Sequence, residues 1–113
     1  MEKIVEQGIL YDFYGELLTE HQRSIYEDAV YNDLSLSEIA EDNGISRQGV
    51  HDLIKRCDKI LVEYEKKLHL VEKFTNIRQK ITEIEKLSIQ TENDSRLQMQ
   101  QVSRLAQEIL EEL

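Results

Sequence analysis

The chain contains no proline and only four glycines in 113 residues. These two residues are the ones that most often end helices and form turns. A chain so poor in both is most simply interpreted as helical nearly throughout, so we expect an all-α fold of about one domain's length. Apolar residues make up 40% and charged residues 33% of the sequence, which is typical of a soluble globular protein rather than of a disordered chain.

Several functional classes are not expected from this sequence. No apolar run approaches the roughly 18 residues that cross a membrane, and Met1-Glu2-Lys3 does not open a signal peptide. Cys57 is the single cysteine, and the three histidines are widely scattered, so we expect neither a disulfide nor a metal site. No glycine-rich phosphate loop or catalytic triad order is present. We therefore expect a cytoplasmic protein with no enzymatic activity and no cofactor.

Two helices are predicted before residue 32, at about 4–18 and about 20–31. Apolar residues three and four positions apart predict one buried face on each. Thr19 and Gln22 form a capping box that opens the second helix. The predicted inner faces consist of Leu10, Phe13, Tyr14, Leu17 and Leu18 in the first helix and of Ile25, Ala29 and Val30 in the second.

A short helix at about 36–43 and a longer one after it are separated by a tight turn. Ser35 and Glu38 form a second capping box, which begins the short helix. Gly44 follows, where a left-handed backbone ends a helix without steric strain. Ser46 then caps the next helix. Two capped helices joined by a three- or four-residue turn with a glycine are typical of a helix-turn-helix.

The apolar residues of this segment fit the same geometry. Ala40 is small enough to lie where the two helices cross. Residues that can lock the second helix onto the first are Ile45, Val50, Leu53 and Ile54. The alternative is a plain helix pair within an all-α domain, with the same caps and a merely solvated outer surface.

The outer surface of the second helix is polar and mostly basic. In helix-turn-helix proteins the N-terminal residues of the recognition helix reach base edges, and flanking residues reach phosphates. Arg47 and Gln48 have the donors that read guanine or adenine, and Lys55 and Arg56 can grip the backbone. The candidate nucleic-acid-binding residues are Ser46, whose helix N-terminus attracts anions, with Arg47, Gln48, His51, Lys55 and Arg56.

Formal charge is unevenly distributed along the chain. Residues 1–45 carry two bases against eleven acids, residues 46–67 carry six against four, and residues 68–113 carry six against eight. With a net charge of −9, the protein should bind nucleic acid only through its basic middle, weakly as a monomer or else as a dimer. Asp52 lies among the candidate readers and would repel phosphate.

Apolar spacing predicts that the helix opened by Ser46 runs to about residue 70. The apolar residues of this helix form a heptad seam along it. A second seam begins near residue 70 and is offset from the first, which predicts a kink or break near 70–76. A polar turn is expected at 90–95 and a last helix at about 96–112. The first seam consists of Val50, Ile54, Cys57, Leu61, Tyr64, Leu68 and Val71, and the last helix is expected to bury Val102, Leu105, Ala106, Ile109 and Leu113.

We therefore expect a helix-turn-helix domain at residues 1–70 and a helical tail at 71–113. The tail has little to cover its apolar faces in so small a chain. It folds back on the first domain or pairs with a second copy. We favour a homodimer, because helix-turn-helix proteins usually bind two half-sites.

Residues 17–56, LLTEHQRSIYEDAVYNDLSLSEIAEDNGISRQGVHDLIKR, resemble region 4 of bacterial sigma-70 factors. The whole chain, including Tyr11-Asp12-Phe13-Tyr14 and the tail, is similar to the small YlxM-type proteins of Gram-positive bacteria. The resemblance implies a sigma-4-like helix-turn-helix fold and a role beside the signal recognition particle, whose genes typically neighbour those of the family. The residues that match are Leu18, Gln22, Arg23, Leu36, Glu38, Ile39, Ala40, Glu41, Gly44, Ile45, Ser46 and Val50.

Three functions remain open at this point. The first is a DNA-binding, dimeric transcription regulator. The second is an adaptor that contacts the protein or RNA of the signal recognition particle, since the acidic residues 1–45 suit a basic partner. The third is an assembly module in which the helix-turn-helix is only a scaffold.

Overall fold

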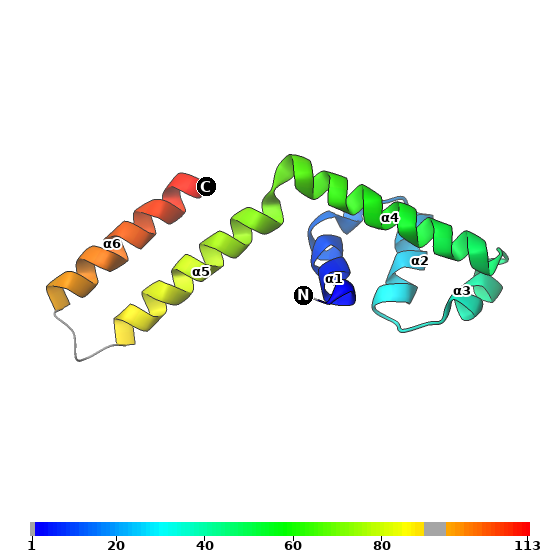
Figure 1. Ribbon diagram of the computed structural model, residues 1–113, viewed down its shortest axis with the longest axis horizontal. Helices are drawn as coiled ribbons and strands as arrows, with labels where there is room; N and C mark the ends of the chain where they lie inside the picture. The colour runs from blue at the N-terminus through cyan, green and yellow to red at the C-terminus, as the bar shows by residue number, and fades with distance from the viewer. Residues whose placement is uncertain (1, 90–94) are drawn as a thin grey trace. The chain divides into compact units, whose positions relative to one another are not determined.

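The computed structural model describes residues 2–89 and 95–113, and its regular structure in those ranges is entirely helical. The predicted all-α fold is thus confirmed (Figure 1). The chain divides into two compact units, the N-terminal unit of residues 1–71 and the C-terminal hairpin of residues 72–113. The predicted turn at 90–95 lies, apart from Ser95, outside the described residues. The helices are α1 (Lys3–Tyr14), the 3-10 helix η1 (Gly15–Leu17), α2 (Glu20–Val30), α3 (Leu36–Asn43), α4 (Arg47–Leu68), α5 (Leu70–Ile89) and α6 (Ser95–Glu112).

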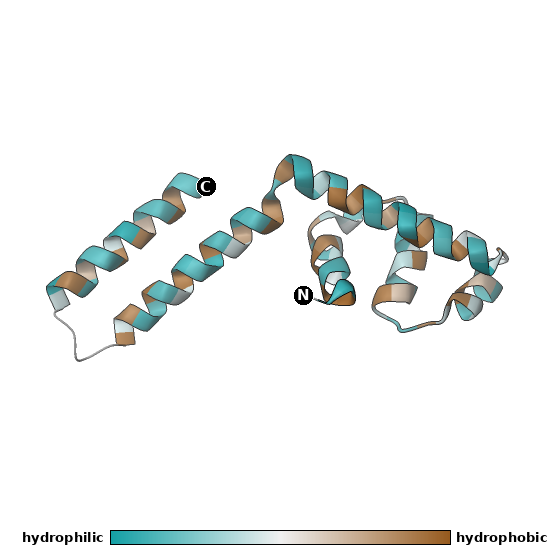
Figure 2. Ribbon diagram, in the orientation of Figure 1, coloured by the Kyte–Doolittle hydropathy of each residue, from teal (hydrophilic) through white to brown (hydrophobic). Residues whose placement is uncertain are grey.

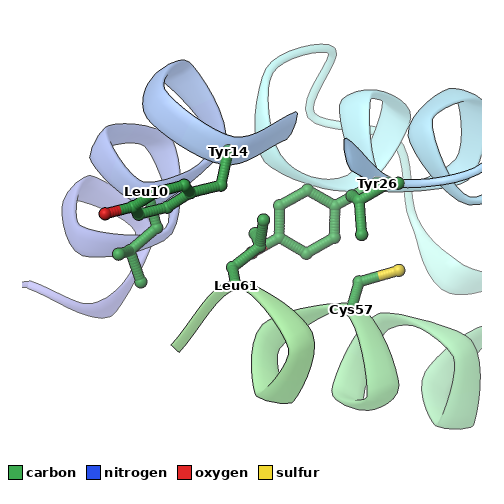
Figure 3. Close-up of a cluster of buried hydrophobic side chains, with 6 residues drawn as sticks. Leu10, Tyr14, Tyr26, Cys57 and Leu61 are labelled. Atoms are coloured by element: carbon green, nitrogen blue, oxygen red, sulfur yellow. The ribbon is translucent and has the colours of Figure 1, made fainter. Parts of the chain in front are cut away.

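One side of the long helix α4 packs against the other helices to form the core of the N-terminal unit. Val50, Cys57 and Leu61 are fully buried along one side of it, as the heptad seam predicted. Cys57 and Leu61 pack with α1 and α2 (Figure 3), and Val50 packs with Ile25 and Ile39 of α2 and α3. Burial raises the pKa of the Cys57 thiol to about 11. The cysteine is therefore a core residue in its protonated form.

Local capping signals were predicted correctly. The Thr19 and Gln22 pair caps α2, and the Ser35 and Glu38 pair caps α3, each with both reciprocal hydrogen bonds present. Gly44 has a left-handed backbone with φ of 65°, which ends α3. These signals place the starts of α2 and α3 and the turn before α4 where the sequence predicted them.

The first predicted helix is shorter than expected. It ends at Tyr14 rather than at residue 18, and η1 follows it. Gly15 lies against the ring of Tyr11, where an added Cβ would come within 2.7 Å of a ring carbon. The tighter 3-10 turn leaves Leu17 55% exposed while Leu18 enters the core. The expectation that Leu17 is buried was wrong, because helical spacing does not continue through this turn.

Buried tyrosines join α1 and α2 to α4 by polar contacts. The Oη of Tyr26 donates a hydrogen bond to Asp58, which also accepts one from Nε2 of Gln7 at 2.9 Å. The Oη of Tyr14 donates to Glu65. Burial, followed by the neighbouring carboxylate, raises the pKa of both phenols. Each pair satisfies polar atoms that the core would otherwise leave without a partner.

Helix α4 ends at Leu68, and the His69 that caps it has a left-handed backbone with φ of 56°. The break therefore lies just before the predicted interval of 70–76. The Oη of Tyr14 accepts a hydrogen bond from the Leu70 amide at 3.1 Å, and Glu65 accepts one from the Val71 amide at 3.0 Å. These contacts satisfy the first amides of α5.

In the C-terminal hairpin α5 and α6 lie side by side and run antiparallel (Figure 1). Hydrophobic residues recur along both helices (Figure 2). Among the described residues of the hairpin, Leu105 is the only buried hydrophobic residue, at 5% exposure. Ala106 is exposed and Leu113 is 84% exposed, so the prediction that α6 buries both was wrong. Two helices alone cannot cover more than one narrow stripe of each other.

Candidate nucleic-acid interface

The start of α4 is fixed by the turn before it. The left-handed Gly44 redirects the chain, and its amide bonds back to Ala40 and Glu41. The Oγ of Ser46 accepts a hydrogen bond from the Gly49 amide at 2.9 Å. Capping leaves the other first-turn amides directed outward, where the positive end of the helix dipole favours an anion.

Three of the residues predicted to contact nucleic acid lie on the side of α4 that faces away from its core. Gln48, His51 and Lys55 recur at spacings of three and four, so they form one stripe. Ser46 and Arg47 stand at its beginning. We call these five residues the outer face of α4. Arg56 is also exposed, but it lies about 100° around the helix from Lys55 and belongs to the flank.

A shallow concavity of about 420 Å³ brings three of these side chains together. Arg47, Gln48 and His51 line it, and Leu36 at the start of α3 completes it. The sequence prediction of the site missed Leu36. The capping box at Ser35 predicts that α3 begins at Leu36, but no local signal places this residue beside the first turns of α4.

Two side chains of the site, Gln48 and His51, lie close to the carboxylate of Asp52. Nε2 of Gln48 donates to Oδ1 of Asp52 at 2.9 Å. Nδ1 of His51 lies 3.7 Å from the same oxygen, an ion pair only when the imidazole is protonated. Nδ1 has no hydrogen-bond partner among the described residues. The bond to Asp52 uses one N–H of Gln48 and leaves its second N–H and its Oε1 available to a ligand.

The basic surface of α4 extends beyond the predicted residues. Lys59 and Lys66 are exposed four and eleven positions after Lys55, so they continue the same stripe. Lys66 is partly neutralised, because its Nζ lies 3.7 Å from Oε1 of Glu63. The spacing from Lys55 was the signal that could have included both lysines in the site.

Within residues 2–89 and 95–113, no group of three or more His, Cys, Asp or Glu side chains could hold a metal ion. None of the helices described there is both long and apolar enough to span a membrane.

Comparison with known proteins agrees with the helix-turn-helix geometry. Residues 1–111 match the family model UPF0122, described as "Putative helix-turn-helix protein, YlxM / p13 like". A UPF0122 protein of Clostridium kluyveri is 55% identical over 80 residues, covering 70% of this chain and 71% of the relative. One from Clostridium botulinum is 58% identical over 73 residues (65% and 67%), and one from Shouchella clausii is 44% identical over 86 residues (76% and 79%). The chain therefore belongs to the UPF0122 family of YlxM/p13-like helix-turn-helix proteins.

Proposed function

We propose that the protein is a cytoplasmic, DNA-binding regulator that reads its site with the outer face of α4. The observation that carries this proposal is the exposure of Arg47 and Gln48 on the first turns of α4, with the half-buried His51 beside them in one concavity. The opposite side of that helix is held by Val50 and Cys57 in the core. Because its core side is fixed by packing and its outer face has long donor side chains, α4 can enter a major groove without rearrangement.

Each side chain has a distinct proposed role. Arg47 and Gln48 contact base edges, and Lys55 and Arg56 contact phosphates on either side. His51 donates to a base or a phosphate from the rim of the concavity. Ser46 caps the helix through the Gly49 amide and leaves the other first-turn amides available to a phosphate. No enzymatic step is part of the proposal.

The charge of the protein limits this binding. The net charge of −9 repels the DNA backbone outside the basic stretch, so a single copy binds weakly. We propose that the protein acts as a homodimer, in which two copies of α4 occupy two half-sites. Pairing doubles the number of phosphate contacts.

Binding to genomic fragments in an electrophoretic shift at low salt tests the proposal. The double variant Arg47→Ala, Lys55→Ala should lose at least tenfold in affinity, and each lost phosphate contact should lower the salt dependence by about one unit of slope. Lys86→Ala changes an exposed lysine of α5 and serves as the control. Unchanged binding by the double variant would show that α4 is not the reader.

A second candidate is an adaptor for the signal recognition particle. The acidic balance of residues 1–45, with eleven acids against two bases, favours a basic protein partner. Purified protein should then retain the particle's GTPase or its RNA in a pull-down at moderate salt. Retention of neither would reject this candidate and leave DNA binding unaffected.

A further inference from the structure

Most of the large apolar residues of the C-terminal hairpin are exposed to solvent. Ile89 at the end of α5 and Leu113 after α6 are 74% and 84% exposed. The hairpin also exposes Phe74 (61%), Ile81 (52%), Leu97 (52%), Met99 (65%) and Leu110 (64%). So many exposed large apolar residues on so small a unit are typical of an interaction site.

The exposed residues of the two helices lie on the same side of the hairpin. In α5, Lys80 and Leu87 face α6, and Phe74 and Ile81 lie about a quarter turn further around the axis. In α6, Leu105 is buried, and Ala106 lies about a quarter turn around in the same rotational sense. Because α5 and α6 run antiparallel, a quarter turn in the same rotational sense about each helix axis leads to the same side of the hairpin.

The opposite side of the hairpin is more highly charged. A groove of about 250 Å³ lies there, lined by Glu83, Lys86, Gln101 and Arg104 together with Leu87 and Leu105. The hairpin thus has a more polar side, which still exposes Leu97, and an apolar side. We call the apolar side the hairpin face, formed by Phe74, Ile81, Met99, Ala106, Leu110 and Leu113.

The sequence of α5 at and beside this face is symmetric about a point in the second half of the helix. Exposed Arg78 and Glu85 have their midpoint between Ile81 and Thr82. Phe74 and Ile89, the two most exposed large apolar residues of α5, share that midpoint. If a second α5 lay antiparallel across this point, each arginine would face a glutamate, and each phenylalanine would face an isoleucine.

Helix α6 has a matching centre at Ala106. Met99 and Leu113 are equally distant from it along the chain, as are Val102 and Leu110. A small residue at the centre allows two helices to approach closely.

The two centres lie at nearly the same level of the hairpin. Nζ of Lys80 is 3.9 Å from Glu108 and 3.3 Å from Glu112, and Gln98 donates to the Leu87 carbonyl at 2.8 Å. Residues near 80 therefore lie across from residues near 110, and Ala106 lies close to the level of Ile81. One two-fold axis can pass through both centres.

We propose that the hairpin face binds a second copy of this chain, face to face about that axis, to form an antiparallel four-helix bundle. An isologous interface requires a self-complementary surface, and the pairing of Arg78 with Glu85 provides one. The face is about 30 Å long and two helices, about 20 Å, wide. Its area, on the order of 600–800 Å² per copy, is what a stable dimer buries. The proposal rests on the homodimer of the proposed function and is independent of DNA binding.

Charge reversal tests the pairing in the full-length protein by sedimentation velocity. Arg78→Glu and Glu85→Arg should each weaken the dimer about five- to tenfold, because symmetry repeats each repulsion. The double variant should recover most of the loss. Glu83→Lys and Lys86→Glu, on the polar side, are the matched controls and should leave the dimer unchanged. Equal weakening by all four, or no recovery in the double variant, would overturn the proposal.

Crosslinking tests the axis. Mild copper-catalysed oxidation should join two copies of an Ile81→Cys or Ala106→Cys variant by a disulfide, while the native protein, with only the buried Cys57, stays unlinked. Lys86→Cys should not crosslink. A native dimer in which Lys86→Cys crosslinks and Ile81→Cys does not would place the interface elsewhere and leave the homodimer intact. A monomeric native protein would reject both this interface and the homodimer. Electrophoretic shifts with DNA, measured on the same variants, test the outer face of α4 separately.

Discussion

The N-terminal unit and the C-terminal hairpin have similar helical character but very different cores. Of the eleven buried hydrophobic residues in the described chain, ten belong to residues 1–71 and only Leu105 belongs to the hairpin. In the first unit, buried tyrosines bond to carboxylates across helices, whereas in the hairpin Lys80 reaches partly exposed glutamates. The difference indicates that the first unit has a core of its own and that the hairpin has very little.

The largest expected effect is the loss of a core leucine. Leu61→Ala in α4 should lower the free energy of unfolding by about 2–5 kcal/mol, because Leu61 is fully buried. Leu110→Ala makes the same change in α6 at a residue that is 64% exposed. Its cost should stay within about 0.5 kcal/mol in dilute protein. Urea unfolding followed by circular dichroism compares the two, and equal losses at low concentration would contradict the contrast.

A somewhat smaller effect is expected from the buried tyrosine contacts. Tyr26→Phe removes the hydroxyl that donates to Asp58 and should cost about 1–3 kcal/mol. Tyr31→Phe removes a hydroxyl that contacts Asp12, but this tyrosine is 50% exposed, so its loss should cost less than about 1 kcal/mol. Thermal or urea unfolding of the two variants ranks them, and a larger loss for Tyr31→Phe would be inconsistent with the burial pattern.

High pH should destabilise the N-terminal unit, which contains every tyrosine and the cysteine. The folded Cys57 thiol has a pKa of about 11 against 9.0 in the unfolded chain, so the unfolded state loses its proton first. Stability is therefore complete below about pH 9 and falls toward pH 11, by roughly 1 kcal/mol per pH unit. Urea unfolding between pH 8 and 10 should show a smaller decline for Cys57→Ala. An identical decline would assign the effect to other groups.

The smallest effect is expected from the polar contacts of the hairpin. Lys80→Ala removes the ion pairs to Glu108 and Glu112 and should cost at most about 1 kcal/mol. The loss should shrink in high salt, which screens partly exposed charges. Helicity of α5 and α6 measured at two salt concentrations checks this. A salt-independent loss above 2 kcal/mol would show that the hairpin holds itself together better than its burial indicates.

Local features of the fold could be predicted from the sequence, and distant ones could not. The capping boxes at Thr19 and Ser35 and the left-handed Gly44 involve residues within a few positions of each other. The partnership of Tyr26 with Asp58 joins residues 32 positions apart, so no spacing rule reveals it. In α6 the amphipathic pattern indicates an apolar side but does not say whether anything in the same chain covers it.

Some features of the candidate site could likewise be predicted from the sequence, and others could not. The spacing of Gln48, His51 and Lys55 on one side of α4 follows directly from helical periodicity. The concavity completed by Leu36 depends on how α3 meets α4, which only the folded arrangement provides. The bond between Gln48 and Asp52 is a choice among side-chain conformations that sequence alone does not make.

The tyrosine at the end of α1 has a consequence for how the chain acquires its structure. The Tyr14 hydroxyl receives the Leu70 amide, 56 positions later in the sequence. During synthesis on the ribosome the acceptor is made well before the donor emerges, so the break after α4 can form this bond as soon as residue 70 leaves the exit tunnel. The remaining turns of α5 must wait for later segments, which gives the nascent protein a built-in order of assembly from its first helix to its last.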